Sequence, residues 1–533
     1  MNVARHTQRF VLLHKYIDEI IIIVASAVLM IESAVLLVYR ETWIDEILAS
    51  FKSYLILTGE FVPYVDSIMS YPPFVIPTFG YVQYLFGPSI YAGRILAACF
   101  FVMLYAVMLW VAARLSGKRA AAAAAALLVS NVLLVSNYIT VTMYALATLL
   151  LMLTVVVELI DIRRNYKALL NGLLFGLLLL SRINFLPALL AYLLFQIVAR
   201  YHARSVALWA AIVIVVVVLG YIPIIRYNPT VALSDVVSPI VSVGIMSQLQ
   251  ASTLAQTFDS FITNLSDFVR EYYGFLLLFF VATVLIIREH GMRRSAYTRD
   301  HKIPLLIWMY AMSMMGAHYF YWKLEGNVYY ANYFMPFVIL FIVVSYRAIR
   351  IERSVAMILL CAVILLNGTL QYRKDIIANP HDISDLERVR IGAEHVAALT
   401  EKEDNILTFD DSLYHAFLAD RRVFAPLLQR NFLFVNSEDT AYIRSIGFYN
   451  WDILNNWLAH DADVVLIHKE TGFEGLRRNP FWGEGEDTDA RIATFRAMLN
   501  NQFQLVETVK NVYPRKYTEG NDGGTLLIYK RKP

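Results

Sequence analysis

The chain has 533 residues, of which 58% are hydrophobic, with a mean hydropathy of +0.53 and a formal net charge of +3. Soluble chains of this length have a smaller apolar share, so the composition excludes an ordinary soluble protein. The small net charge gives no sign of nucleic-acid binding, and the two cysteines, both in apolar runs, predict no disulfide framework.

Long apolar runs dominate the sequence as far as residue 372 and match the thickness of a bilayer core. The basic N-terminus is followed by an apolar run that is too long for a signal peptide, so we expect a retained first span. The fold class predicted is therefore an α-helical polytopic membrane protein. We expect about eleven transmembrane helices, at 18–39, 89–113, 120–136, 138–160, 168–181, 184–199, 206–225, 273–288, 304–322, 328–346 and 354–371.

Basic residues occupy the polar breaks between these runs. With the predicted spans, six basic breaks fall on one side of the membrane, at 5–15, 117–119, 163–167, 200–204, 288–302 and 347–353. The positive-inside rule makes that side, and the N-terminus, cytoplasmic. Loops 40–88 and 226–272 and the tail 373–533 then lie outside.

The outer segments differ in character. In loop 40–88, apolar residues between 47 and 55 follow helical spacing and predict a helix that lies in the membrane interface. The tail changes composition and predicts a small α/β domain of residues 373–533 after a transmembrane domain of residues 1–372. Its expected elements are strands at 405–409, 463–467 and 525–529 and helices at 385–400 and 489–501.

Two acidic residues, Asp45 and Glu46, follow the first span, where the chain reaches the outer face. Acids at a helix end are often simply solvated, and the pair alone supports that reading as well as a functional one. In the functional reading, one carboxylate removes a proton from an acceptor hydroxyl.

Four cationic or potentially cationic groups gather at the same depth, against the positive-inside trend: Arg94, Arg182, His318 and Lys323. Arg94 alone is explained equally well by snorkelling to the headgroups. An intramembrane arginine is costly, however, and by default indicates a site. Together the four groups could neutralise a lipid phosphate and stabilise it as a leaving group. Neither a metal nor a cofactor is expected, since zinc spacings and glycine-rich phosphate loops are lacking.

Residues 42–96 contain several short elements in a fixed order. Asp45-Glu46 is followed by Pro72-Pro73, Phe86-Gly87 and Arg94-Ile95. With its topology, long first outer loop and outer tail, the chain resembles the GT-C superfamily of glycosyltransferases, which use polyprenyl-phosphate-linked sugars. It resembles in particular the branch of protein mannosyltransferases and lipid A aminoarabinose transferases.

The resemblance implies a GT-C-like fold with Asp45 as the catalytic base and Glu46 as its neighbour. It also implies that Arg94 is a ligand of the lipid phosphate, and we expect Tyr71 and Tyr333 to contact the substrate.

Two positions depart from the family's pattern. Thr142 stands where an arginine is common, and Asn332 replaces a second arginine, just before Tyr333. These departures bear on the contacts to the donor phosphate. The Trp-Trp-Asp signature of oligosaccharyltransferases is absent, which disfavours transfer of a whole oligosaccharide to asparagine.

We therefore expect an inverting glycosyltransferase of the plasma membrane that transfers a hexosyl or pentosyl unit on the non-cytoplasmic face. Its expected partners are a polyprenyl-phosphate-linked sugar, membrane lipids and a lipid, glycan or protein acceptor. The alternatives are a transporter or lipid-linked-glycan flippase and a receptor-like module whose tail binds glycan. Glu32 in the first span is expected to pair with a polar neighbour, whereas a place in a proton pathway would suit a transporter better. Transporters usually have repeated halves and broken midplane helices, and the sequence gives no sign of either.

Overall fold

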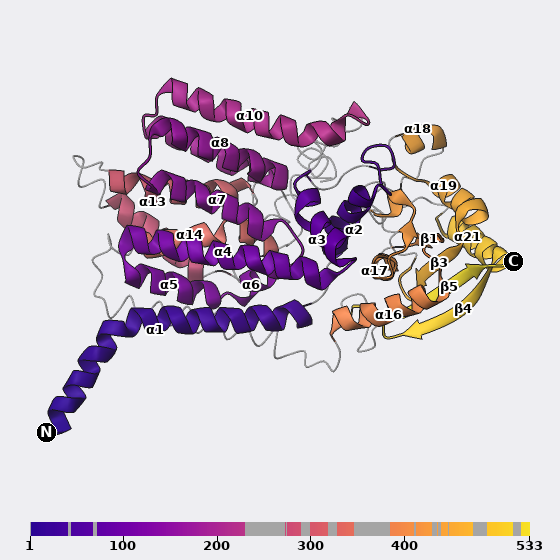
Figure 1. Cartoon of the computed structure of the whole chain (residues 1–533), viewed down its shortest axis with the longest axis horizontal. Coiled ribbons are helices and arrows are strands. Elements are labelled where there is room, and N and C mark those ends of the chain that lie inside the picture. The colour runs from indigo at the N-terminus through magenta and orange to yellow at the C-terminus, as the bar shows by residue number, and fades with distance from the viewer. Residues whose placement is uncertain are drawn as a thin grey trace, which may run out of the picture.

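The computed structural model describes residues 2–40, 44–67, 72–229, 272, 274–288, 299–317, 328–345, 384–409, 412–428, 434, 439–445, 447–472, 488–514 and 524–533. The chain forms a long array of helices with a small β-sheet at one end (Figure 1). The C-terminus lies at the sheet end, and the N-terminus lies at the opposite end (Figure 1).

The helical array contains α1 (Asn2–Tyr39), α2 (Ile44–Thr58), η1 (Ile76–Gly80), α3 (Tyr81–Phe86), α4 (Ile90–Ser116), α5 (Lys118–Val129), α6 (Val132–Ile139), α7 (Tyr144–Leu159), α8 (Arg164–Ser181), η2 (Ile183–Phe185), α9 (Leu186–Val198), α10 (Ala203–Ile225), the helix Gly274–Arg288, α13 (Arg299–Gly316), η4 (Val328–Tyr333) and α14 (Met335–Ser345). Local sequence sets several of these boundaries. The Ser89 hydroxyl accepts a hydrogen bond from the Ala92 N–H at 3.2 Å and so caps α4. Gly117 has a φ of +88°, which glycine adopts without strain, and this lets the chain turn from α4 into α5.

In the described part of the chain, three helical segments are long and apolar enough to cross a membrane: Tyr16–Tyr39, Ile90–Ser116 and Ala203–Ile225. A fourth crossing is possible if α5 and α6, which meet at an angle of 77°, form one broken span. Four shorter apolar helices accompany them, Tyr144–Leu159, Ile183–Val198, Gly274–Arg288 and Met335–Ser345. These helices make the chain an integral membrane protein. The expected span at 354–371 lies outside the described residues, and the count of eleven stays a prediction.

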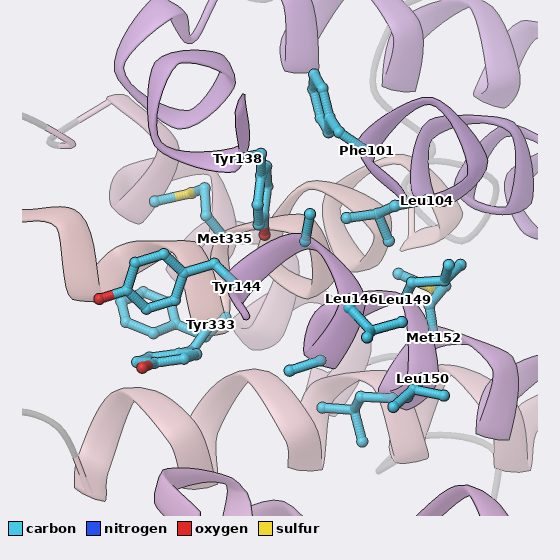
Figure 2. Close-up of a cluster of buried hydrophobic side chains, with 14 of the residues drawn as sticks. Phe101, Leu104, Tyr138, Tyr144, Leu146, Leu149, Leu150, Met152, Tyr333 and Met335 are labelled. Carbon is cyan, nitrogen blue, oxygen red and sulfur yellow. The ribbon is translucent and has the colours of Figure 1, made fainter. Parts of the chain in front are cut away.

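Helix α7 lies at the centre of the array. Its residues Leu149 and Met152 join a buried cluster with Phe101 and Leu104 of α4 and Met335 of α14 (Figure 2). Because α7 is buried along most of its length, its first residue is carried into the interior of the protein.

Glycines set the close packing of α8 against α10. A Cβ atom on Gly176 of α8 would lie 2.5 Å from the Val216 side chain, and one on Gly220 of α10 would lie 2.4 Å from Leu180. Membrane helices commonly approach each other through such small residues. This contact fixes the position of α8, and with it the residue at its C-terminal end.

The sheet has the strand order β2-β1-β3-β5-β4. Strand β1 is parallel to β2 and β3, whereas β5 is antiparallel to β3 and β4. The elements of this region are α16 (Asp385–Leu399), β1 (Asn405–Thr408), α17 (Leu413–Leu418), β2 (Arg422–Val423), α18 (Thr440–Ser445), α19 (Trp451–Asn456), η8 (Trp457–Asp461), β3 (Val464–His468), α21 (Thr488–Gln502), β4 (Phe503–Lys510) and β5 (Thr525–Arg531).

Both faces of the sheet are covered. In β3, Val464 and Leu466 belong to one apolar cluster, whereas Val465 and Ile467 belong to another. Alternate residues of a strand point to opposite faces, so the central strand is buried on both sides. Strands β1, β3 and β5 and helices α16 and α21 occupy the places that the sequence predicts. The assignment of residues 373–533 to a separate outer domain stays a prediction.

Helix α2 connects the helical array to the sheet region. It forms where the periodicity predicts a helix, and its apolar residues are buried within the protein. The ring of Phe51 packs on Phe417 of α17 with centroids 5.0 Å apart. The Tyr54 hydroxyl donates a hydrogen bond to the carboxylate of Asp420 at 3.2 Å. The apolar face of α2 is thus covered by α17 and its neighbours, and the expected position of this helix in the membrane interface stays a prediction.

Candidate functional site

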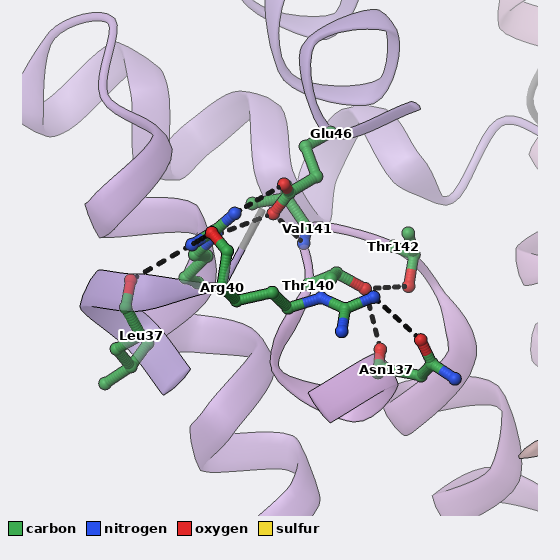
Figure 3. Close-up of polar contacts among 8 residues, drawn as sticks. Leu37, Arg40, Glu46, Asn137, Thr140, Val141 and Thr142 are labelled. Atoms are coloured by element: carbon green, nitrogen blue, oxygen red, sulfur yellow. Dashed lines mark hydrogen bonds and ion pairs between the residues drawn. The ribbon is translucent and has the colours of Figure 1, made fainter. Parts of the chain in front are cut away.

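A buried ion pair joins the start of α2 to the second turn of α4. Arg94 donates from Nε to Oε1 of Glu46 and from Nη2 to Oε2, both at 2.8 Å, and both side chains are 0% exposed. The Nη1 group of Arg94 donates to the carbonyl oxygens of Leu37 and Arg40 at 3.1 Å, and the N–H of Val141 donates to Glu46 at 3.0 Å (Figure 3). The pair thus fixes the end of α1, the start of α2 and the turn between α6 and α7.

A glycine makes this arrangement possible. A Cβ atom at Gly93 would lie 2.7 Å from the Val141 side chain, which is closer than atoms can approach. Glycine at this position therefore lets the turn that contains Val141 come against α4, where its N–H reaches Glu46.

The charges of the pair cancel within the protein. Burying a lone charge is costly, whereas a bidentate pair with further hydrogen bonds offsets most of that cost. In these contacts, Arg94 holds Glu46 and the end of α1. The predicted role of Arg94 as a ligand of the lipid phosphate stays a prediction.

A second cluster forms around Tyr144, the first residue of α7. Asp45 and Arg182 are half-buried, and both interact electrostatically with Tyr144. The Arg182 guanidinium carbon lies 4.6 Å from the centre of the Tyr144 ring. That ring meets Tyr333 edge-on at 5.2 Å, and Tyr333 meets Phe185 at 4.9 Å. An acid, a cation and two tyrosines therefore gather at one place.

The ends of four elements create this cluster. Asp45 lies in the first turn of α2, Tyr144 begins α7, and Tyr333 ends η4. Arg182 has an extended backbone, with φ −159°, at the break between α8 and η2. Figure 2 shows the hydroxyl ends of Tyr144 and Tyr333 directed away from Leu146. A carboxylate that can accept a proton beside a guanidinium that can bind an anion suits group transfer from an anionic leaving group.

Neutral polar residues lie next to both clusters. The Asn137 amide oxygen accepts a hydrogen bond from Arg40 at 2.8 Å (Figure 3), and the Tyr138 hydroxyl donates to the backbone carbonyl of Asn332. The hydroxyls of Thr140 and Thr142 are 3.3 Å apart. Except for the half-buried Arg40, all of these side chains are almost fully buried. Within the described residues, no group of three or more His, Cys, Asp or Glu side chains is placed to hold a metal ion.

Comparison with solved structures identifies the fold. ArnT from Cupriavidus metallidurans, bound to undecaprenyl phosphate, matches with a TM-score of 0.59 at 12% identity, covering 96% of this chain and 97% of that chain. The Archaeoglobus fulgidus oligosaccharyltransferase in the apo form matches with a TM-score of 0.51 at 12% identity, covering 88% and 72%. The chain has the GT-C fold. No family model matches the sequence, and no curated protein matches it significantly.

The GT-C resemblance predicted from the sequence is thus confirmed at the level of fold. Within this fold, Asp45, Arg182 and Tyr333 come together around Tyr144. Glu46 and Arg94 form the buried pair that joins the start of α2 to α4. The expected site residues Tyr71, His318 and Lys323 lie outside the described residues, and their roles stay predictions.

Sequence reasoning missed two residues at or beside the candidate site. Tyr144 lies two residues after Thr142, and nothing in its local sequence distinguishes it from the tyrosines of an interface belt. Arg40 is a basic residue at the outer end of the first span, against the positive-inside trend. That signal was available and could have added Arg40 to the cationic set.

Proposed function

We propose that this protein is a membrane glycosyltransferase that transfers a monosaccharide from a polyprenyl-phosphate donor to a hydroxyl acceptor on the non-cytoplasmic face. The observation that carries the proposal is the cluster of Asp45, Arg182, Tyr144 and Tyr333 in a GT-C fold. The structural similarity to ArnT, which was solved with undecaprenyl phosphate, supports the class of donor.

The reaction needs little acid catalysis, because polyprenyl phosphate leaves as a stable anion. A cation beside the phosphate stabilises the charge that develops as the bond breaks. Arg182 is half-buried next to the aromatic rings and is our first candidate for this contact. Arg94, His318 and Lys323 are the further candidates proposed from the sequence.

The harder step is activation of the acceptor hydroxyl, whose pKa is far above neutrality. Asp45 is our proposed general base. Glu46 accepts three hydrogen bonds within the buried network, whereas Asp45 is half-buried and takes no part in that network. In a single displacement, the acceptor oxygen bonds to the anomeric carbon, the bond to the phosphate oxygen breaks, and Asp45 takes the proton. The configuration at the anomeric carbon is therefore inverted.

Aromatic rings suit the neutral part of the donor. Tyr144 and Tyr333 contribute ring faces and edges beside the charged groups, and sugars commonly pack against such rings. We propose Tyr333 as a substrate contact, together with Tyr71 from the first outer loop.

The first experiment compares cells that contain the wild-type chain, the Asp45→Asn variant or a deletion of the gene. Mass analysis of glycolipids, free glycans and glycoproteins should show one hexose or pentose increment that the deletion removes. Asp45→Asn keeps size and hydrogen bonding but removes the base, so we expect a rate loss of about 10²–10⁴-fold. Binding of undecaprenyl phosphate to the purified variant should be largely retained.

Asp18→Asn is the matched control, because Asp18 lies near the start of the apolar segment Tyr16–Tyr39, far along α1 from Asp45, and pairs with Arg119 at 3.7 Å. We expect normal products from this variant. Near-normal product formation by Asp45→Asn would reject Asp45 as the base, and a retained anomeric configuration in the product would reject the single displacement.

A lipid-linked-glycan flippase is the second candidate. The 77° bend between α5 and α6 favours it, because broken helices often line the transport sites of transporters. In reconstituted vesicles, a flippase would move labelled undecaprenyl-phosphate sugars between leaflets without forming a new glycosidic bond. Bond formation that depends on Asp45 favours the transferase.

A further inference from the structure

The side-chain amide of Asn332 has an unusual environment. The residue is 0% exposed, yet neither its Oδ1 nor its Nδ2 atom has a hydrogen-bond partner among the described residues. Its backbone carbonyl, by contrast, accepts a hydrogen bond from Tyr138. Leaving a buried donor and acceptor unpaired costs free energy, so an amide in this state calls for an explanation.

The position of Asn332 connects it to the proposed site. It directly precedes Tyr333, whose ring contacts both Tyr144 and Phe185. The same Tyr138 that binds the Asn332 carbonyl follows Asn137, and the Nδ2 atom of Asn137 is also buried and unpaired among the described residues. Unpaired amide atoms of two residues, both of those of Asn332 and the Nδ2 atom of Asn137, are thus connected to Tyr138.

The chemistry of an amide restricts the group that could satisfy it. Nδ2 donates hydrogen bonds and Oδ1 accepts them. Oxygens of an ionised phosphate only accept, so a phosphate would leave Oδ1 unpaired. Hydroxyl groups both donate and accept, and a hydroxylated ring can satisfy both halves of the amide. A positively charged side chain at this position would instead favour the phosphate.

We propose that the Asn332 amide is a specificity-determining contact for hydroxyl groups of the transferred sugar. The inference rests on the proposed function. Asn137, which directly precedes Tyr138, supplies a second buried donor, its Nδ2 atom. A site that hydrogen-bonds a hydroxyl discriminates strongly against ligands that lack it, because its own polar atoms are then left unpaired.

The test begins with stability, because a purely structural amide and a ligand-binding amide give opposite results. Asn332→Leu keeps approximate size and removes the two unpaired polar atoms, so we expect an unchanged or higher Tm. Asn171→Leu is the matched control. Asn171 is fully buried, and its Nδ2 atom donates to Glu158 at 2.8 Å and to Tyr192 at 2.6 Å. Its loss should lower Tm.

Binding is then measured on the purified proteins with undecaprenyl phosphate and with undecaprenyl phosphates that carry glucose, mannose, galactose or arabinose. For the sugar-bearing lipid that the wild type binds most tightly, we expect Asn332→Leu to weaken binding by about 10- to 100-fold, the range for hydrogen bonds lost in a dry site. The affinity for undecaprenyl phosphate without a sugar should be unchanged. Asn332→Ala repeats the measurement if the leucine variant does not fold.

Three outcomes would overturn the inference. The first is a Tm loss in Asn332→Leu as large as that in Asn171→Leu, which would indicate an amide paired with internal water. The second is an equal loss of affinity for the lipids with and without a sugar. The third is wild-type protein that binds undecaprenyl phosphate but gains nothing from any sugar, which leaves the lipid-phosphate part of the proposed function intact. Wild-type protein that binds none of these lipids would reject the proposed function itself.

Discussion

The buried pair of Glu46 and Arg94 combines two charges with backbone groups from two segments, the end of α1 and the turn between α6 and α7. A guanidinium can bind both carboxylate oxygens in one plane, which an ammonium group cannot do. Because Asp45 directly precedes Glu46, the pair also fixes the position of the first turn of α2, which contains the proposed base. The two residues are therefore positioning groups for Asp45 in the contacts that the structure shows.

Removing one partner of this pair should be costly. Arg94→Ala leaves the Glu46 carboxylate buried without its counter-charge, and we expect a loss of roughly 3–5 kcal/mol in the free energy of unfolding. Thermal and denaturant unfolding of the purified protein measure it. In the double variant with Glu46→Gln, part of that loss should be recovered, because no unpaired charge remains.

Unchanged stability together with lost lipid binding would support the role of Arg94 as a phosphate ligand, which the sequence predicts. If Arg94→Ala unfolds like the wild type but no longer binds undecaprenyl phosphate, Arg94 acts as a phosphate ligand and not as a positioning residue.

At the scale of elements, α2 receives support from two directions. Its first turn is held by Arg94, and its middle is held by α17 through the rings of Phe51 and Phe417. Arg422, in β2, lies 3.6 Å from Glu60 just beyond α2 and adds a charged contact. The sheet region thus bears directly on the helix that carries the proposed base.

Truncating the aromatic contact tests this connection. Phe417→Ala removes a fully buried ring, and we expect a loss of about 3–5 kcal/mol in stability together with reduced turnover. Undecaprenyl phosphate binding should change less than turnover, since α2 carries the base. Phe424→Ala is the control, because Phe424 stacks on Trp457 at 4.8 Å and packs against an apolar cluster to which no α2 residue belongs. Equal effects of both variants on turnover would show that α17 has no special role.

Two buried histidines make the sheet region sensitive to acid. The rings of His415 on α17 and His468 on β3 lie 4.8 Å and 3.9 Å from that of Tyr513. Burial lowers the pKa of His415 to about 3 and that of His468 to about 4, although Glu470 at 3.4 Å partly opposes the shift of His468. Both histidines are therefore neutral in the folded protein at physiological pH.

The unfolded chain binds these protons more readily, because a free histidine has a pKa of about 6.5. Stability is therefore constant with pH above that value and falls as the pH drops towards the lowered values. Between pH 7.5 and pH 5 we expect a loss of roughly 2 kcal/mol for each histidine, measured by unfolding. His415→Gln should reduce the slope by about half. A slope that His415→Gln does not alter would contradict this account.

At the scale of the whole molecule, the charges divide between two ends. Lys118 pairs with Glu19 at 2.7 Å near one end of the spanning part of α1, whereas Arg94 binds carbonyls at the other end. Arg164 donates to the carbonyl of Arg200, which brings two of the basic breaks together. The predicted topology places the breaks that contain Lys118, Arg164 and Arg200 on the cytoplasmic side and Arg94 near the outer side.

Cysteine labelling checks that topology. In a background without Cys99 and Cys361, we expect Glu403→Cys in the tail to react with an impermeant reagent in intact cells. Lys118→Cys should react only after permeabilisation. The reverse pattern would place the tail, and the proposed site with it, in the cytoplasm.

Much of the local structure could be predicted from the sequence, because hydropathy and periodicity are local signals. The apolar runs locate helices such as α4, and the buried strands β1, β3 and β5 are continuous apolar segments. Strand β4 was not predicted, because most of its residues are exposed, as expected of an edge strand. The site was predicted in part. Charged residues are easy to recognise in an apolar chain, but the sequence does not show which residues they contact. Glu46 and Arg94 are 48 residues apart, and no local pattern connects them.

The order of the groups around Arg94 has a consequence for biosynthesis. The carbonyls of Leu37 and Arg40 and the carboxylate of Glu46 all precede Arg94 in the chain. They therefore leave the ribosome before α4 does, and the arginine reaches the bilayer after the groups that neutralise it. An unpaired arginine is costly in a membrane. A rearranged gene that encodes α1 and α2 after α4 would consequently lose efficiency at membrane insertion, although the finished protein could form the same contacts.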